Sequence, residues 1–240
     1  MQTLKAKLVS VQALTHDTSY FVFSEVNGSP LNFQAGQYLI LQVQDGKEGK
    51  ASRSYSLASS PNGSSEFAFI IRLLPDGRGS NYLKSLSPGD EVEFMGPFGH
   101  FVVKDDAKDI LMIATGTGLA PFVSMIPELF KASQKPKIRL YFGLRFEEDI
   151  FYKEKLEAWV KEHPEFDCYL TVSRPTENWS GLRGRVTEHL EHAHLDPQNT
   201  HVYICGNGEM VKSVKEFLEA KGFPKEAIHL ELFSPIVARI

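Results

Sequence analysis

The sequence Ile113-Ala114-Thr115-Gly116-Thr117-Gly118-Leu119-Ala120-Pro121 lies near the middle of the 240-residue chain. The nearly continuous apolar run at residues 109–114 leads into its glycines, and an apolar helical pattern begins at Leu119. Such a run is typical of a parallel strand that is buried on both faces. A strand, a tight glycine turn and a helix N-terminus present N–H groups and a positive dipole end to a nucleotide pyrophosphate. Because a lone Gly-Thr-Gly turn can also be a plain connection, the interpretation depends on the flanking sequence.

The residues after Asp109 alternate between strand-like and helical patterns. The strand-like runs span residues 109–114, 138–143, 167–173, 201–205 and 228–233, and the helical patterns span residues 119–132, 151–162, 185–192 and 210–221. Such βα units predict a five-stranded, parallel, doubly wound α/β sheet that binds its ligands at the carboxyl ends of the strands. The charged stretch at residues 104–108 is the expected linker, so residues 105–240 are expected to form one domain.

Residues 1–104 have a different pattern and are expected to form the first domain. Strand-like runs span residues 7–14, 20–24, 37–44, 52–58, 66–74 and 91–94, with turns rich in glycine, proline and asparagine between them. Six short strands at regular spacing predict an antiparallel six-stranded Greek-key β-barrel. Only residues 80–85 have a helical pattern, which begins at Ser80 directly after Gly79. A short helix N-terminus of this kind can bind a phosphate group.

Composition excludes several classes of function. The formal net charge is -4, so the chain lacks the basic footprint of a protein that binds nucleic acid or an anionic membrane. No apolar run approaches the roughly 18 residues of a membrane-spanning helix, and the first residues lack the apolar region of a secretion signal. Two distant cysteines, Cys168 and Cys205, cannot form an iron–sulfur cluster. We expect a cytoplasmic protein without a metal site.

One strand of the expected barrel carries Arg53-Ser54-Tyr55-Ser56. Alternation along a strand places Arg53 and Tyr55 on one face. An arginine offers a bidentate fork to a pyrophosphate, a tyrosine can stack against an isoalloxazine ring, and a serine hydroxyl can hydrogen-bond flavin N5. The same four residues are also compatible with an exposed strand edge.

Four segments together carry a family resemblance. They are Arg-x-Tyr-Ser at residues 53–56, Gly-Arg-Gly-Ser-Asn-Tyr-Leu at residues 77–83, Gly-Pro-Phe-Gly at residues 96–99 and Gly-Thr-Gly-Leu-Ala-Pro at residues 116–121. In order and spacing the chain resembles the ferredoxin–NADP⁺ reductase superfamily over essentially its whole length. The resemblance implies that the barrel binds FAD and that the α/β domain binds NADPH or NADH.

The resemblance also implies which barrel residues bind FAD. The expected residues are Arg53, Ser54, Tyr55, Ser56, Ile70, Arg72, Gly79 and Ser80. Of these, Arg53, Tyr55 and Ser56 would hold the flavin, and the Gly79-Ser80 turn would hold its pyrophosphate. Ile70 and Arg72 lie on the strand that passes the FAD phosphates in the family, although Arg72 can equally be a solvated strand residue.

The expected nucleotide-binding residues lie at the ends of strands in the second half of the chain. They are Thr115, Gly116, Thr117, Gly118, Ser173, Arg174, Arg183, Cys205, Gly206, Asn207 and Met210. Arg174, Arg183 and Arg185 at one strand end suit a 2′-phosphate, because arginine matches phosphate geometry and stays charged. The similarity of Ser173-Arg174 to the plant-type reductases implies NADPH. The Trp-x-Gly-x-x-Gly-x-Val pattern at residues 179–186 also occurs in relatives that prefer NADH, so NADH stays open.

Three residues are expected to act at the reacting rings, namely Ser56, Cys205 and Glu231. The resemblance places Cys205 beside the nicotinamide, where it packs and orients. Glu231 would assist proton traffic at flavin N5, or would be a charged strand end. Phe233 would cover the flavin as the terminal aromatic does in plant-type reductases, but residues 234–240 continue beyond it. Either Phe233 or this tail is therefore the expected shield.

The predicted reaction is hydride transfer from reduced nicotinamide to FAD, followed by electron transfer to ferredoxin or flavodoxin. The first alternative is an NAD(P)H:flavin reductase, with a free flavin as acceptor, or the reductase component of an oxygenase. The second is a non-catalytic regulatory module that binds flavin or nucleotide. The protein is expected to be a monomer without nucleic-acid or membrane partners.

Overall fold

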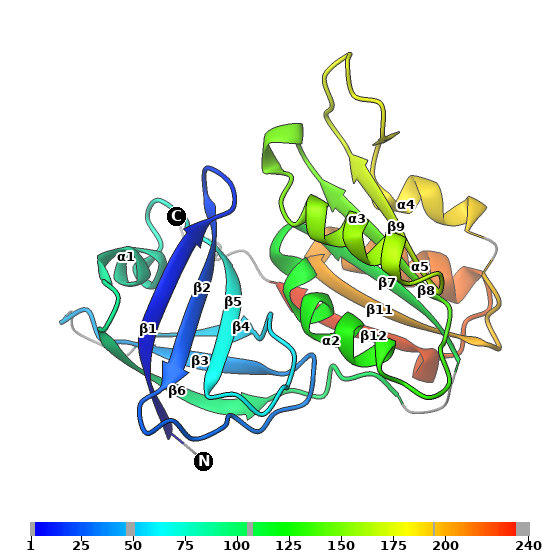
Figure 1. The fold of residues 1–240 in the computed structure, drawn as a ribbon. Coiled ribbons are helices and arrows are strands. Elements are labelled where there is room, and N and C mark those ends of the chain that lie inside the picture. The colour runs from blue at the N-terminus through cyan, green and yellow to red at the C-terminus, as the bar shows by residue number, and fades with distance from the viewer. Residues whose placement is uncertain (1–2, 47–50, 105–107, 194, 234–240) are drawn as a thin grey trace. The chain divides into compact units, whose positions relative to one another are not determined.

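The computed structural model describes residues 3–46, 51–104, 108–193 and 195–233 (Figure 1). Two compact units divide the chain: Met1–Val103 with Ala120–Glu128, and Lys104–Leu119 with Leu129–Ile240. The expected domain boundary between residues 104 and 105 differs from this division by one residue, Lys104, and in the segment that holds most of α2, Ala120–Phe130. Within the described residues, no helix has the length and apolarity needed to cross a membrane.

The first unit is built on a six-stranded antiparallel sheet, as predicted. Its strands are β1 (Thr3–Ala13), β2 (Thr18–Glu25), β3 (Tyr38–Val43), β4 (Ala51–Ser56), β5 (Glu66–Arg72) and β6 (Glu91–Phe98). They are arranged in the order β4-β3-β6-β1-β2-β5. An antiparallel bridge between Leu57, just after β4, and Phe69 of β5 joins the two outer strands. The sheet therefore closes on itself, which removes its exposed edges.

Aromatic side chains fill the barrel because alternate residues of each strand point inward. The ring of Phe23 lies 5.2 Å from that of Phe94 and 6.1 Å from that of Phe67, measured between centroids. These three side chains are at most 1% exposed. Burying a phenylalanine contributes about 1.5–3 kcal/mol to folding. The barrel core thus gives β4 and β5 a rigid support.

The barrel's helix, α1 (Arg78–Ser85), begins two residues before the predicted start at Ser80. Gly77 is the N-cap and makes no side-chain cap hydrogen bond. Ser80 lies in the first turn, where its Oγ accepts a hydrogen bond from the backbone N–H of Leu74 at 3.0 Å. The predicted start of the helix was wrong because the Ser80 hydroxyl binds the preceding loop instead of capping the helix.

The second unit contains a six-stranded parallel sheet. Its strands are β7 (Asp109–Thr115), β8 (Ile138–Leu144), β9 (Phe166–Val172), β10 (Leu182–Arg183), β11 (Thr200–Asn207) and β12 (Ile228–Phe233). Their order is β10-β9-β8-β7-β11-β12. All five predicted strands are present, and the two-residue strand β10 is additional. The doubly wound fold is confirmed.

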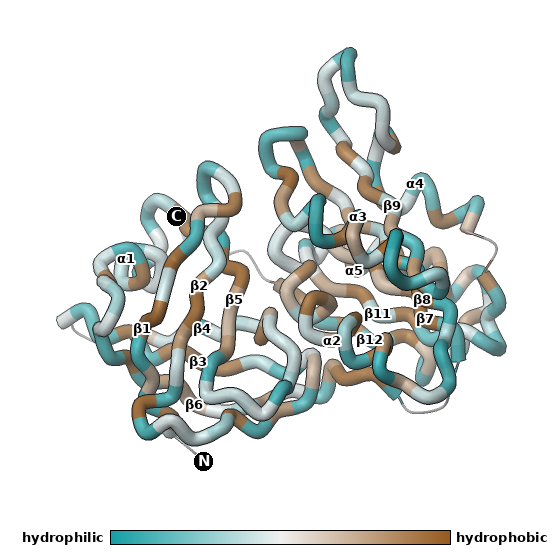
Figure 2. Tube along the Cα trace, in the orientation of Figure 1, coloured by the Kyte–Doolittle hydropathy of each residue, from teal (hydrophilic) through white to brown (hydrophobic). Residues whose placement is uncertain are grey.

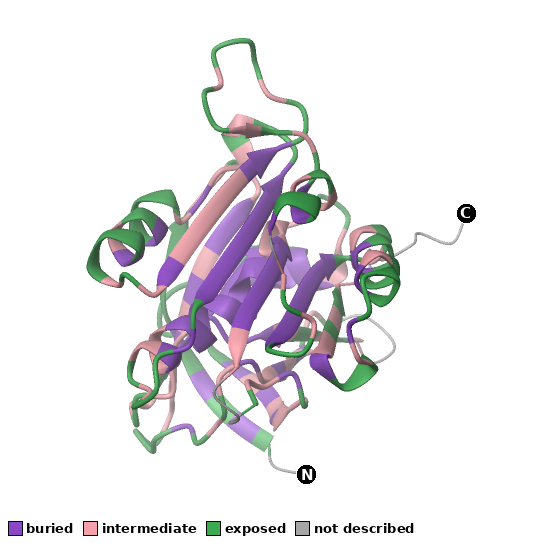
Figure 3. Ribbon diagram, turned by 90° about the vertical axis from the view of Figure 1, so that its right-hand side faces the viewer, coloured by how far each residue is buried: buried purple, intermediate pink, exposed green. Residues whose placement is uncertain are grey.

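Helices and short turns connect these strands. Besides α2, which follows β7, they are the 3₁₀ turns η1 (Gly116–Leu119), η2 (Glu147–Asp149), η3 (Leu190–His192) and η4 (Lys225–Ala227) and the helices α3 (Lys153–Glu162), α4 (Val186–His189) and α5 (Gly208–Ala220). The helix predicted at residues 185–192 is divided between α4 and η3. The central strands β7 and β8 consist mostly of apolar residues and are largely buried (Figures 2 and 3).

The strand order reverses between β7 and β11. The chain passes from β7 outward through β8 and β9 to β10, and then returns to place β11 on the other side of β7. Ligands of open α/β sheets bind at the carboxyl ends of the strands where the order reverses. This position coincides with the glycine turn after Thr115 and with the end of β11 at Asn207.

Candidate functional site

In the barrel, two residues of β4 meet the first turn of α1. Arg53 and Tyr55 share a face of β4, as the alternation predicted, and both are half-buried. A Cβ atom placed on Gly79 would lie 2.8 Å from Arg53 Cγ and 3.3 Å from Tyr55 Oη. Only glycine therefore lets α1 begin this close to β4. The first N–H groups of α1 have no acceptor within the helix, and they lie next to the arginine.

The electrostatics of this group suit a pyrophosphate beside an aromatic ring. The Arg53 guanidinium donates from Nη1 to the carbonyl of Ser52 at 2.7 Å, which orients it along β4. Burial raises the pKa of Tyr55 to about 12, against a smaller lowering by the charge of Arg53. The phenol is therefore neutral at physiological pH and its ring packs 6.0 Å from Phe69. These residues fit the pyrophosphate and ring of FAD.

The other predicted FAD residues lie in different surroundings. Ser56 is buried at the end of β4, whereas Ser54 is exposed on the opposite face of that strand from Tyr55. Ile70 is 3% exposed. Arg72 donates from Nε to Asp17 Oδ2 at 2.6 Å, which ties it to the turn between β1 and β2. The structure thus places Arg53, Tyr55 and Gly79 together, whereas Arg72 is bound to the carboxylate of Asp17.

In the second unit, the turn after β7 is locked against the end of β11. A Cβ atom on Gly118 would lie 2.3 Å from the carbonyl oxygen of Cys205, and one on Gly206 would lie 2.3 Å from Thr115 Oγ1. The Asn207 N–H donates to Thr115 Oγ1 at 3.1 Å. Two glycines and one hydroxyl therefore bring the two strand ends into direct backbone contact.

The glycine turn leaves one side open. Gly116 has a φ of +54°, and no atom lies within 4 Å of the position a Cβ would occupy. Gly116 and Thr117 are half-exposed and belong to the first turn of η1. The N-terminus of α5 is by contrast capped, because Asn207 Oδ1 accepts from Glu209 N at 2.9 Å and from Met210 N at 3.4 Å. The glycine turn is therefore the more open of these two helix starts to an anion.

Cys205 lies directly opposite Glu231 in the register of β11 and β12. It is fully buried, and burial together with the charge of Glu231 raises its pKa well above the usual range of a thiol. The thiol is therefore protonated and packs as a small apolar group. Phe233 ends β12 opposite Asn207. The predicted alternative shield, residues 234–240, lies outside the described residues.

At the far strand ends, Ser173 and Arg174 directly follow β9. Their N–H groups donate to the carbonyls of Leu144 and Arg145 at 3.0 and 2.8 Å. The Arg174 side chain is exposed and has no hydrogen bond or ion pair with the residues that the structure describes. Its guanidinium is free to bind an anion.

Arg183 differs from Arg174. Its Nη2 donates to the backbone carbonyls of Thr176, Glu177 and Trp179 at 3.1, 2.9 and 2.7 Å. The predicted partner of a phosphate is thus already engaged with the loop that precedes it. Arg185 is exposed and forms the N-cap of α4.

The sequence interpretation missed Glu147, which lies just beyond the end of β8. Its Oε1 accepts hydrogen bonds from Thr176 N at 2.7 Å and from Thr176 Oγ1 at 2.6 Å. These two bonds, and then the charge of Arg183, lower the pKa of Glu147 below its ordinary value. The available signal was the run Glu147-Glu148-Asp149 shortly after the predicted strand at residues 138–143, at the edge where ligands bind.

Comparisons with known proteins cover both units. The family-level pattern of the oxidoreductase FAD-binding domain matches residues 5–103, and that of the oxidoreductase NAD-binding domain matches residues 112–216. A ferredoxin–NADP reductase B of Sorangium cellulosum is 35% identical, over 97% of this chain and 98% of its own length. The anthranilate 1,2-dioxygenase electron transfer component of Acinetobacter baylyi is 31% identical, over 97% of this chain and 68% of its own length.

Solved structures show the same two-domain fold. A ferredoxin NADP⁺ reductase from Neisseria gonorrhoeae with bound FAD and NADP superposes with a TM-score of 0.85 at 27% identity, over 97% of this chain and 99% of that one. An Amycolatopsis cytochrome P450 reductase superposes with a TM-score of 0.89 at 26% identity, over 98% of this chain and 70% of that one.

Proposed function

Because this chain belongs to the ferredoxin–NADP⁺ reductase superfamily, we propose that it oxidises NADPH and passes the electrons to a ferredoxin or flavodoxin. The protein is an FAD-dependent NAD(P)H oxidoreductase. When bound, FAD would supply the redox chemistry between reduced nicotinamide and the acceptor, and the protein would supply binding, orientation and electrostatics. The proposal places this activity in the cytoplasm, where the thiols of Cys168 and Cys205 stay reduced.

In the proposal, the residues of the barrel bind and orient FAD. Arg53 and the N–H groups around Gly79 hold its pyrophosphate, and the neutral Tyr55 ring packs against the flavin. Ser56 donates a hydrogen bond at flavin N5. The observation that supports these roles is the contact of Gly79 with both Arg53 and Tyr55, where any Cβ would meet the arginine side chain at 2.8 Å.

The residues at the reversal of strand order bind the nucleotide in the proposal. The open turn at Gly116 receives the pyrophosphate on its N–H groups, and Cys205 packs beside the nicotinamide as a neutral thiol. Glu231 exchanges a proton near the reacting rings. Arg174 binds the 2′-phosphate that distinguishes NADPH from NADH, which is supported by its exposed guanidinium at the end of β9.

One observation supports ferredoxin or flavodoxin as the acceptor. The relative that matches this chain over 98% of its own length has the name of a ferredoxin–NADP reductase. The reductase component of an oxygenase is the second candidate, since the anthranilate dioxygenase component is 31% identical. This chain spans 68% of that relative's own length.

Anaerobic rapid mixing of the purified flavoprotein tests the proposal. We expect NADPH to bleach the flavin absorbance much faster than NADH, and the reduced protein to reoxidise rapidly with ferredoxin or flavodoxin. Reoxidation only by free flavin would favour a flavin reductase. A bound flavin that neither nucleotide bleaches would overturn the catalytic function in favour of a regulatory module.

Substitution of Arg174 by alanine tests the nucleotide preference. Loss of one charge-assisted phosphate contact removes about 1.5–3 kcal/mol of binding, so the KM for NADPH should rise about 10- to 100-fold. The KM for NADH should change less than about twofold. Equal increases for both nucleotides would contradict the role of Arg174.

A further inference from the structure

Residues 173–182, between Val172 of β9 and Arg183 of β10, form a loop that is held by hydrogen bonds of its own. Residues 173–182 leave the carboxyl end of β9 and return so that β10 pairs in parallel with it, with Arg183 opposite Val172. Gly184 N donates to the Val172 carbonyl at 3.0 Å, which closes the base of the loop. This loop carries Ser173, an expected nucleotide-binding residue, and Arg174, the proposed ligand of the 2′-phosphate. Its conformation therefore decides where Arg174 stands.

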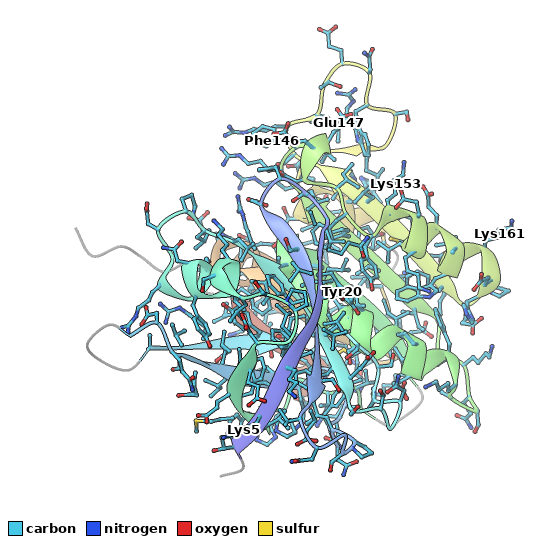
Figure 4. The ribbon with its side chains drawn as sticks, turned by 60° about the vertical axis from the view of Figure 1, so that its left-hand side comes forward. Lys5, Tyr20, Phe146, Glu147, Lys153 and Lys161 are labelled. Carbon is cyan, nitrogen blue, oxygen red and sulfur yellow. The ribbon has the colours of Figure 1, made fainter. Side chains whose placement is uncertain are left out.

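Two side chains hold the loop from opposite sides. From β10, Arg183 Nη2 donates to three carbonyls of the loop, at 2.7–3.1 Å. From the end of β8, Glu147 Oε1 accepts both the N–H and the hydroxyl of Thr176. Figure 4 shows Glu147 at the base of this loop, beside Phe146. The two charged groups therefore act on one residue, since Thr176 gives its carbonyl to Arg183 and its N–H to Glu147.

Within the loop, Trp179 folds back over Gly181. Its Nε1 donates to the Leu182 carbonyl at 3.0 Å, and a Cβ on Gly181 would lie 2.4 Å from the indole ring. The ring thus packs on the backbone that leads into β10. The Trp-x-Gly part of the motif at residues 179–186 therefore has a structural role. It fixes the turn that precedes Arg183.

We infer that Arg183 and Glu147 form a brace that positions the loop, and that Arg183 acts on nucleotide binding through this loop instead of binding the 2′-phosphate itself. This inference rests on the proposed function, because it concerns how the proposed nucleotide site is held. One amino group with two hydrogens already serves three carbonyl acceptors. A phosphate on that group would have to displace them and release the loop.

The brace and the direct ligand make opposite predictions for Arg183→Ala. Loss of the brace lets Ser173 and Arg174 move together, so the KM for NADPH should rise roughly 5- to 30-fold, and the KM for NADH, which does not depend on Arg174, should rise by a smaller factor of at least about three. If Arg183 were a direct ligand of the 2′-phosphate, the KM for NADH should instead stay within about twofold of the wild type. Arg183→Lys keeps a charge and three donors, so it should restore part of the loss for both nucleotides.

Glu147→Ala should reproduce the effect of Arg183→Ala, because it releases the same threonine. The matched control is Glu148→Ala, which removes the same charge from the next, exposed position. It should leave both KM values within about twofold of the wild type. An NADPH-specific rise in Arg183→Ala, or no rise at all, would overturn the brace.

Hydrogen exchange supplies a measurement that needs no turnover. In the FAD-loaded wild type, the Thr176 amide hydrogen is bound to Glu147, so exchange in the peptide covering residues 173–182 should be slow. Exchange should quicken about tenfold in Arg183→Ala and Glu147→Ala, but not in Arg174→Ala or Glu148→Ala. Unchanged exchange in the first two variants would refute the brace. If neither nucleotide reduces the wild type, the proposed function fails, while the exchange rates still decide the structural part of the inference.

Discussion

The contact of Gly118 with the end of β11 allows a quantitative prediction. In Gly118→Ala the new Cβ would lie 2.3 Å from the Cys205 carbonyl oxygen and 2.6 Å from its carbon, whereas ordinary contact begins at 3.4 Å. The obstructing atoms are backbone atoms of a buried central strand, which cannot rotate away as a side chain can. The turn must therefore move by about 1 Å, since overpacking of this kind displaces backbone. We expect a cost of about 3 kcal/mol, the upper end for such substitutions.

Differential scanning calorimetry measures this cost. For a protein of this size, about 3 kcal/mol corresponds to a decrease in Tm of roughly 6–12 °C. The matched control is Gly116→Ala in the same turn, where a Cβ meets no atom within 4 Å but the φ is +54°. Its left-handed backbone costs about 1 kcal/mol, or roughly 2–4 °C.

Gly118→Ala should have the lower stability of the two variants, whereas Gly116→Ala should have the weaker nucleotide binding. Gly116 borders the open side of the turn, so its new methyl group would occupy the space proposed for the pyrophosphate, and the KM for NADPH should rise at least about tenfold. FAD content should stay near that of the wild type in both variants. A Gly118→Ala protein whose Tm lies within about 2 °C of the wild type would refute the steric argument. An unchanged KM in Gly116→Ala would refute the placement of the pyrophosphate.

Three further outcomes are expected. Arg53→Ala should lose bound FAD on gel filtration, because the substitution removes the positive charge beside the proposed pyrophosphate site at Gly79. A variant that keeps a full complement of flavin would contradict this. Native Cys205 should resist iodoacetamide at pH 8, with labelling by mass spectrometry only after denaturation, because burial and Glu231 keep its pKa raised. Asp17→Asn should lower stability by at most about 1 kcal/mol at pH 7. Burial raises the pKa of Asp17, but the hydrogen bonds from Arg72 and Thr18 and the nearby charges lower it by more, so the net pKa is lowered. The stabilisation by Asp17 is therefore complete above the unfolded pKa and is lost as the pH falls through the folded pKa. Urea unfolding would refute this if the stability difference between Asp17→Asn and the wild type were equal at pH 7 and pH 3.

Local pattern was enough to predict both sheets, apart from the two-residue strand β10. The switch from alternating strands to strand–helix units near residue 109 is a property of neighbouring residues, because side chains alternate along a strand and recur at helical spacing along a helix. The pairing of Arg53 with Tyr55 followed from the same alternation. The start of α1 could not be predicted in this way, because the Ser80 hydroxyl could accept a hydrogen bond either from the first turn of the helix or from another segment. In the structure it accepts one from the Leu74 N–H.

The amino-acid sequence by itself determined the two folds, the glycine turn after β7 and the residue types available for binding FAD and a nicotinamide nucleotide. Only the tertiary structure decided which of those residues are free. Arg174 and Arg183 are alike in sequence, yet one guanidinium is open and the other meets three carbonyls. Gly118 is required by Cys205, which lies far along the chain. The physical reason is that a hydrogen bond or a steric contact depends on the orientation of distant backbone segments, which no local periodicity contains.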